Sequence, residues 1–178
     1  MSTVMETCPI VDPAGQSDAR EAPPAPGLGR LAGRRLAVLD IAKLGSAVFV
    51  DQVETTLREC ADSLDIERGI APPSRGMPEE QLAAIAERCD GAVLALADCG
   101  TCSSWTLLDA IELNRRGCRA VLVTTEPLRP TIDALAGRLG MSSLPVVEVA
   151  LPNREQTSDE VTATALAAGP QLVEALVG

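Results

Sequence analysis

The sequence of 178 residues contains no histidine, no tyrosine, one tryptophan and one phenylalanine. Histidine is the commonest general base in enzymes, so its absence excludes Ser–His and Cys–His hydrolase mechanisms. Any proton transfer has to use a carboxylate, a lysine, a cysteine or water. Because aromatic side chains are so scarce, the core has to be built from leucine, valine, isoleucine and alanine.

Long apolar runs are also absent. No stretch approaches the roughly 20 apolar residues that a membrane span requires, and no apolar segment follows a basic N-terminal region, so we expect no signal peptide. The net charge of −10 argues against nucleic acid and anionic membranes as partners. Only one pair among the six cysteines is close in sequence, so we expect no disulfide framework. These features predict a cytoplasmic protein.

Composition divides the chain into two parts. Residues 1–33 hold five of the 13 prolines and show no hydrophobic periodicity, which predicts a flexible tail. Residues 34–178 have the length and apolar content of a single domain.

Apolar runs and helical periodicities alternate along residues 34–178. Strands are predicted at 35–43, 64–70, 91–97, 119–126 and 144–150, with helices between them. The last helix, from about residue 158, is interrupted by Gly169 and Pro170, so we expect a kink or two short helices. This alternation predicts an α/β fold with a five-stranded parallel sheet, helices on both faces and the flavodoxin-like order 2-1-3-4-5. In that order a crevice opens where strands 1 and 3 part.

The stretch 98–117, DCGTCSSWTLLDAIELNRRG, places Cys99 and Cys102 where a strand ends and a helix begins. Unpaired N–H groups and the helix dipole stabilise an anion at that position, so we expect a lowered thiol pKa. Four interpretations are open: thiol–disulfide exchange, nucleophilic or reductive chemistry on a small molecule, half of a zinc site, or two packing cysteines. Asp98 is a candidate proton acceptor or a helix N-terminal acid.

Further candidates follow other strands. Lys43, after the first strand, is suited to holding a carboxylate, forming a Schiff base or lowering a thiol pKa; it is otherwise an exposed loop lysine. Ser74 and Arg75 are candidates for binding an anionic group. Thr125 and Glu126 end the fourth strand at the crevice rim, Thr125 as a substrate-binding residue and Glu126 as a general acid or base.

The helix after the cysteine pair supplies the remaining candidates. Ser103, Ser104 and Trp105 are assigned to substrate binding, and Trp105 is either a lid over the thiols or part of the core. Asp109 and Glu112 are expected on the solvated face of this helix. Cys89 and Cys118 are expected to be packing residues, and Cys8 lies in the predicted tail.

No phosphate-binding glycine loop follows the first strand, because LDIAKLGS offers one glycine only. A nucleotide cofactor is therefore disfavoured. We expect no resident cofactor and no metal, with an external thiol or dithiol as a possible reductant.

The stretches LADCGTCSSWTLLDAIELNRRG (96–117) and AVLVTTEP (120–127) resemble the bacterial UGSC-motif family. That family is itself similar to the selenoprotein B component of glycine, sarcosine and betaine reductases. The resemblance runs from LDIAK (39–43) to LGMSSLPVVEV (139–149) and leaves out the tail. It places Cys99 at the selenocysteine position, Cys102 at the paired cysteine and Lys43 at the lysine of an LDxxK segment. It implies a redox-active nucleophile that forms a covalent adduct with its substrate.

The sequence departs from the family pattern at several positions. Leu44 and Gly45 replace a Pro-Asn pair, Ala71 replaces a second lysine, and Leu108 replaces a histidine. These losses imply a divergent enzyme with a different substrate, or one subunit of a pair whose partner supplies the missing groups.

The leading hypothesis is a cysteine-dependent enzyme of redox or covalent type acting on a small organic molecule. Cys99 is the nucleophile, Cys102 the resolving or assisting thiol, and Lys43 lowers the thiol pKa or holds the substrate. The alternatives are a general thiol–disulfide reductase and a non-catalytic subunit that complements a homologous chain. Homo-oligomers and hetero-oligomers are both compatible with the sequence.

Overall fold

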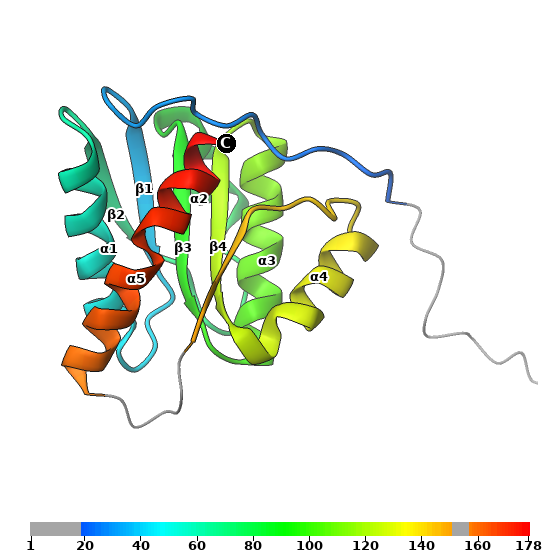
Figure 1. Ribbon diagram of the computed structural model, residues 1–178. Coiled ribbons are helices and arrows are strands. Elements are labelled where there is room, and N and C mark those ends of the chain that lie inside the picture. Colours follow the sequence, from blue (N-terminus) through cyan, green and yellow to red (C-terminus); the bar gives the residue numbers. More distant parts are fainter. Residues whose placement is uncertain (1–18, 151–156) are drawn as a thin grey trace, which may run out of the picture.

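A computed structural model of the chain describes residues 19–150 and 157–178 (Figure 1). Five parallel strands form one sheet in the order β2-β1-β3-β4-β5. Their bounds are β1 (Arg35–Asp40), β2 (Asp65–Ile70), β3 (Gly91–Ala97), β4 (Arg119–Thr125) and β5 (Val146–Val149). The predicted fold class and strand order are confirmed.

Helices cover both faces of the sheet. They are α1 (Ser46–Cys60), α2 (Glu79–Arg88), α3 (Gly100–Arg115), α4 (Arg129–Arg138) and α5 (Ser158–Val177), with a short 3-10 turn, η1 (Glu126–Leu128), before α4. One core lies between the sheet and α2, α3 and α4, and a second lies under α1 and α5. Figure 1 shows α1 and α5 side by side over their face. None of the helices in the described part of the chain has the length and hydropathy to cross a membrane.

Strand β3 contributes side chains to both cores. All seven of its residues are buried, and the side chains from Ala92 to Ala95 alternate between the faces. Ala92 and Leu94 enter the core under α3, whereas Val93 and Ala95 enter the core under α1 and α5. A central parallel strand buried on both faces is apolar throughout, which is the pattern of its sequence.

Of the two alternatives predicted for the last helix, two short helices is wrong, because α5 is one continuous helix that contains Pro170. Proline removes a backbone donor from the helix interior, but packing outweighs that loss here. Ala168, Leu172 and Leu176 are buried against the sheet and α1. Gly169 allows the close approach, since a Cβ there would lie 2.6 Å from a methyl carbon of Thr56.

Residues 19–33 pack on the domain, although the sequence analysis assigned them to a flexible tail. Leu28 and Leu31 are buried in the core under α1 and α5. The Leu28 N–H donates to the carbonyl of Leu176 (2.9 Å), and the Ala25 N–H donates to Oδ1 of Asn114 (3.1 Å). The rest of the predicted tail, residues 1–18 with Cys8, lies outside the described residues.

Candidate functional site

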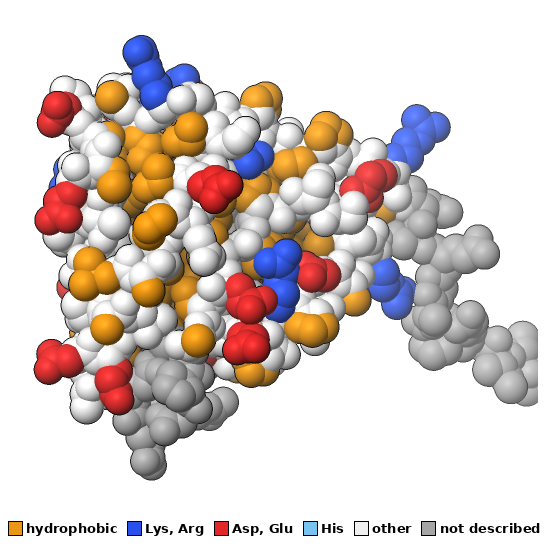
Figure 2. Space-filling model, in the orientation of Figure 1, with side chains coloured by type: hydrophobic (Ala, Val, Ile, Leu, Met, Phe, Trp, Pro, Cys, Tyr) orange, Lys and Arg blue, Asp and Glu red, His pale blue; other side chains and the backbone are white. Residues whose placement is uncertain are grey.

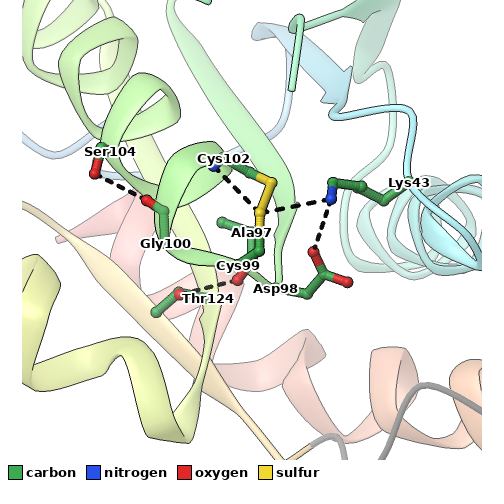
Figure 3. Close-up of a disulfide and its surroundings, with 8 residues drawn as sticks. All are labelled: Lys43, Ala97, Asp98, Cys99, Gly100, Cys102, Ser104 and Thr124. Atoms are coloured by element: carbon green, nitrogen blue, oxygen red, sulfur yellow. Dashed lines mark hydrogen bonds and ion pairs between the residues drawn. A yellow bond between two sulfur atoms is a disulfide. The ribbon is translucent and has the colours of Figure 1, made fainter. Parts of the chain in front are cut away.

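Cys99 and Cys102 occupy the junction between β3 and α3, as the sequence predicts (Figure 3). Cys99 is the N-cap residue of α3 in extended conformation, and Cys102 is the third residue of the helix. The two form a disulfide, with their Cα atoms 5.5 Å apart. The two side chains differ in access: Cys102 is 1% exposed, whereas Cys99 is half-buried. A reagent arriving from solvent therefore meets Cys99 first.

Two donors converge on the sulfur of Cys99 (Figure 3). The Cys102 N–H donates to Cys99 Sγ at 3.4 Å, and Lys43 Nζ donates to the same atom at 3.5 Å. Lys43 Nζ also lies 3.8 Å from Oδ1 of Asp98. Donors and a positive charge beside a sulfur favour its thiolate form. Once the disulfide is reduced, this environment favours a negative charge on Cys99.

A hydrogen-bonded loop after β1 brings Lys43 to this place. The carboxylate of Asp40 accepts from the hydroxyl of Ser46 and from the Ala42 N–H. The Lys43 N–H donates to Ser46 Oγ at 2.8 Å, which fixes the backbone that carries the ammonium group. Gly45 has a φ of 79°, a left-handed conformation that glycine adopts readily before α1 begins. Sequence analysis missed Asp40 and Ser46, whose only signal is an acid at a strand end and a serine at a helix start.

The three predicted substrate-binding residues of α3 lie in different environments. Ser103 is 1% exposed, and its hydroxyl has no hydrogen-bond partner among the described residues. Ser104 donates its hydroxyl to the Gly100 carbonyl at 2.8 Å. Trp105 is 38% exposed and is not a core residue; it lies beside Gly76 of the β2–α2 loop.

The remaining predicted site residues lie at the same end of the sheet. Ser74 and Arg75 are exposed in the loop between β2 and α2, and Glu126 is exposed at the start of η1. Thr125 is 7% exposed. In the described part of the chain, no hydrogen bond or ion pair joins these four side chains to the disulfide. Sequence analysis overlooked Thr124, whose hydroxyl donates to the Ala97 carbonyl at 3.0 Å and ties the end of β4 to the end of β3 (Figure 3).

The prediction that Asp109 lies on the solvated face of α3 is wrong. Asp109 is 3% exposed, and both of its carboxylate oxygens accept from the Met77 N–H, at 3.1 and 3.2 Å. Burial raises the pKa of this carboxyl group to about 6. Glu112, predicted with it, is half-buried and pairs with Arg116 at 2.7 Å.

The model of the UGSC family matches residues 9–178, which is nearly the whole chain. The chain belongs to the UGSC family. The match includes most of the N-terminal segment that the resemblance in the sequence left out. Among curated proteins, no relative matches the chain.

Solved structures of several proteins resemble this UGSC-family chain at low identity. A flavodoxin-like domain from Synechococcus sp. is 10% identical, with 79% of this chain and 96% of that chain covered and a TM-score of 0.43. A diflavin flavoprotein A3 from Nostoc sp. is 10% identical, with coverages of 80% and 93% and a TM-score of 0.44. An FMN-dependent NADH-azoreductase from Bacillus anthracis in complex with FMN is 8% identical, with coverages of 81% and 100% and a TM-score of 0.43. The fold assignment rests on the strand order of the chain itself.

The UGSC-family site also offers three ligand atoms for a metal ion. Asp98, Cys99 and Cys102 each contribute one atom, and these atoms lie within 4.8 Å of one another. The two sulfurs become ligands only after the disulfide is reduced, because thiolates bind metal. Lys43 Nζ lies 3.5 Å from Cys99 Sγ and 3.8 Å from Asp98, so its positive charge competes with a cation for this position. The arrangement favours thiol chemistry over metal binding.

Three other cysteines lie in the described residues. Burial raises the pKa of the Cys89 thiol to about 11 and that of the Cys118 thiol to about 12. Both side chains belong to the core under α2, α3 and α4, which confirms their assignment as packing residues. Cys60 is exposed at the C-terminal end of α1.

Proposed function

We propose that this UGSC-family chain is a cysteine-dependent enzyme of redox or covalent type that acts on a small organic molecule. One observation carries the proposal: Lys43 Nζ and the Cys102 N–H converge on the sulfur of Cys99, at 3.5 and 3.4 Å. These groups favour a thiolate at the sulfur that solvent reaches more easily. The family's kinship to the selenoprotein B component, implied by the motif, agrees with a nucleophile at this position.

The proposed reaction begins with the reduced pair. The Cys99 thiolate attacks an electrophilic atom of the substrate: a bond forms between that atom and sulfur, and the bond from that atom to a leaving group breaks, the group departing with the bonding electron pair. Asp98 or water accepts the proton of the Cys102 thiol. Cys102 then attacks Cys99 Sγ, the sulfur–substrate bond breaks, and its electron pair leaves with the substrate atom, which takes a proton. The substrate gains two electrons, and the pair is oxidised to the disulfide. An external thiol or dithiol reduces the disulfide again, so no resident cofactor is required.

Cationic and polar groups at this end of the sheet favour a substrate with an anionic group. Lys43 lies at the sulfur, and Arg75 and Ser74 are exposed on the neighbouring β2–α2 loop. Thr125, Ser103, Ser104 and Trp105 complete the proposed substrate surface, and Glu126 is the proposed proton carrier at the rim. A cytoplasmic location fits a pair that has to be kept reduced.

A second function, thiol–disulfide exchange with another protein, is favoured by the disulfide itself. In this function the half-buried Cys99 exchanges with a partner disulfide and Cys102 resolves the mixed disulfide. A third role is that of a complementing subunit. Figure 2 shows apolar side chains gathered over α5 and its neighbours, where Leu166 is 49% exposed. Such a surface suits a homo-oligomer or a pair with a homologous chain.

The experiment that tests the leading function is pH-dependent alkylation of the reduced protein, followed by mass spectrometry. We expect Cys99 to react ahead of the other five cysteines, with an apparent pKa well below the free-thiol value of about 8.5. Cys102→Ser is the control, since it removes the resolving thiol and leaves Cys99 in place. An unselective reaction among the six cysteines would refute nucleophilic chemistry at Cys99. Insulin as a disulfide substrate separates the two enzymatic functions, because only a protein reductase precipitates its chains.

A further inference from the structure

The β2–α2 loop, residues 71–78, is hydrogen-bonded to neighbouring elements at both of its ends. At its start the Ala71 N–H donates to the Asp40 carbonyl at the end of β1 (2.8 Å). Near its end the Met77 N–H donates to Asp109 on α3. The loop therefore crosses from the end of β1, whose following loop carries Lys43, to the helix that carries Cys102. The loop is thus anchored beside the end of β1 and against the helix that begins at the cysteine pair.

Asp109, which accepts the hydrogen bond at the far end of the loop, is a carboxylate in a buried position. Asp109 is 3% exposed, and within the part of the chain that the structure describes it forms no ion pair. Burying a carboxylate without a cation costs stability, and burial raises its pKa to about 6. An apolar residue there would leave the buried Met77 N–H without an acceptor. The carboxylate therefore holds the backbone of the loop against α3.

Trp105 provides the surface on which the loop lies. A Cβ atom at Gly76 would lie 3.3 Å from Asp109 Oδ1 and 3.5 Å from the Trp105 ring. The backbone of the loop thus lies directly against both side chains of α3. Trp105 is three residues beyond Cys102 and Asp109 is seven beyond, so one helix carries the thiol and both side chains that contact the loop.

We propose that Asp109 is a positioning residue that seats the 71–78 loop against Trp105, and that the seated loop controls the access of reactants to Cys99. The proposal rests on the proposed reactivity of Cys99. Ser74 and Arg75 are exposed in the middle of this loop, so the position of the loop also fixes the place of a cationic group at this end of the sheet. With the loop released, bulky reagents reach Cys99 and the contribution of Arg75 to binding an anionic substrate is lost.

The sequence contains a single tryptophan, so fluorescence reports on Trp105 alone. The variants are Asp109→Ala, which removes the acceptor for the Met77 N–H, and Asp109→Asn, which keeps a carbonyl oxygen there. Glu112→Gln, on the same helix, is the matched acidic control. Each full-length, reduced protein is measured for acrylamide quenching of Trp105 and for alkylation of Cys99 by iodoacetamide and by a polyethylene-glycol maleimide. Circular dichroism and thermal unfolding check the fold.

We expect Asp109→Ala to increase the quenching of Trp105 and to raise the ratio of bulky to small alkylation rates at Cys99 about fivefold, the effect of one lost hydrogen bond. Asp109→Asn and Glu112→Gln should stay near the parent protein in both measurements. Parent values for folded Asp109→Ala overturn the proposal. If Asp109→Ala does not fold, Gly76→Val replaces it, because the added side chain pushes the loop away from Trp105; Asp109→Asn remains the control. An unchanged ratio of bulky to small alkylation rates in Gly76→Val then overturns the proposal.

The outcome for the proposed function is separate. If Cys99 of the parent protein reacts no faster than the other cysteines, the proposed function fails, whereas the quenching of Trp105 still tests how the loop is seated. If Cys99 is selective and the variants do not change its access, only the role of Asp109 fails.

Discussion

Two pairs of cysteines lie at opposite ends of the parallel sheet, and their surroundings differ in kind. Cys89 and Cys118 precede β3 and β4, are buried among aliphatic side chains, and have raised thiol pKa values. Cys99 and Cys102 follow β3, begin a helix and lie beside Lys43. In a parallel sheet the helices begin at the carboxyl ends of the strands, and the N-terminus of a helix stabilises a negative charge. The same residue type is therefore inert at one end of the sheet and suited to chemistry at the other.

The largest effect that this comparison predicts is a difference in thiol reactivity. With pKa values of about 11 and about 12, Cys89 and Cys118 carry little thiolate at neutral pH. Even an unperturbed thiol with a pKa of about 8.5 carries about 300 times more thiolate than one at 11. In the reduced, folded protein we expect Cys99 to alkylate at least that much faster, measured by mass spectrometry of peptides. Comparable rates at both ends of β3 would break the comparison.

Burial raises the pKa of Asp109, as it does that of Cys118. Because the pKa of Asp109 then differs between the folded and unfolded states, the free energy of unfolding depends on pH. Its folded pKa of about 6 lies above the ordinary value of 3.8, so the folded state binds the proton more tightly. The stability contributed by this group is full below pH 3.8 and is lost as the pH rises through 6. The difference corresponds to about 3 kcal/mol at most.

Urea unfolding of the parent and Asp109→Asn between pH 4 and pH 7 measures this effect. The difference in the free energy of unfolding between the two proteins isolates Asp109, because contributions from the other groups cancel. It should favour Asp109→Asn most at pH 7, where the buried carboxylate of the parent is charged. A constant difference across this range would contradict the assigned burial.

Serine substitutions should separate packing thiols from site thiols. Cys118→Ser puts a hydroxyl into an apolar site and should lower the free energy of unfolding by about 2 kcal/mol, the cost of an unsatisfied buried hydroxyl. Cys99→Ser, at a half-buried position, should cost less than about 1 kcal/mol when the protein is reduced. Denaturant unfolding with a reductant present provides both numbers. Equal losses would show that the thiol before β4 and the thiol after β3 are equally structural.

Lys43 is expected to contribute the smallest of these effects, because its side chain is 31% exposed and water screens its charge. Lys43→Met should slow Cys99 alkylation at neutral pH by about tenfold, since it removes the cation beside the thiolate. Lys43→Arg keeps the charge and should retain most of the rate. The gap between the parent and Lys43→Met should narrow as salt is added. If Lys43→Met alkylates at the parent rate, Lys43 does not activate Cys99, and the N-terminus of α3 alone would account for the reactivity of the thiol.

Much of the architecture could be predicted because its signals are local. The run GAVLALA is apolar on both faces, which marks a central parallel strand, and Cys99 follows it directly. The burial of Asp109 has no such signal: α2, α4 and the 71–78 loop all flank α3 and bury a wider arc than the sheet alone would. The packing of residues 19–33 on the domain has no local signal either, because the Ala25 N–H bonds to Asn114, which lies 89 residues away in the sequence.

The sequence by itself determined the alternation of strands and helices, the parallel sheet, and the cysteine pair at a strand-to-helix junction. These follow from periodicity and from neighbours along the chain. Only the tertiary structure decided that Lys43 meets Cys99, 56 residues away, and that Asp109 holds the loop at Met77, 32 residues away. Parallel pairing brings the carboxyl ends of distant strands to one edge, so the loops after them meet there. Which of their side chains touch depends on backbone details such as the Asp40–Ser46 hydrogen bond, and no local pattern encodes those.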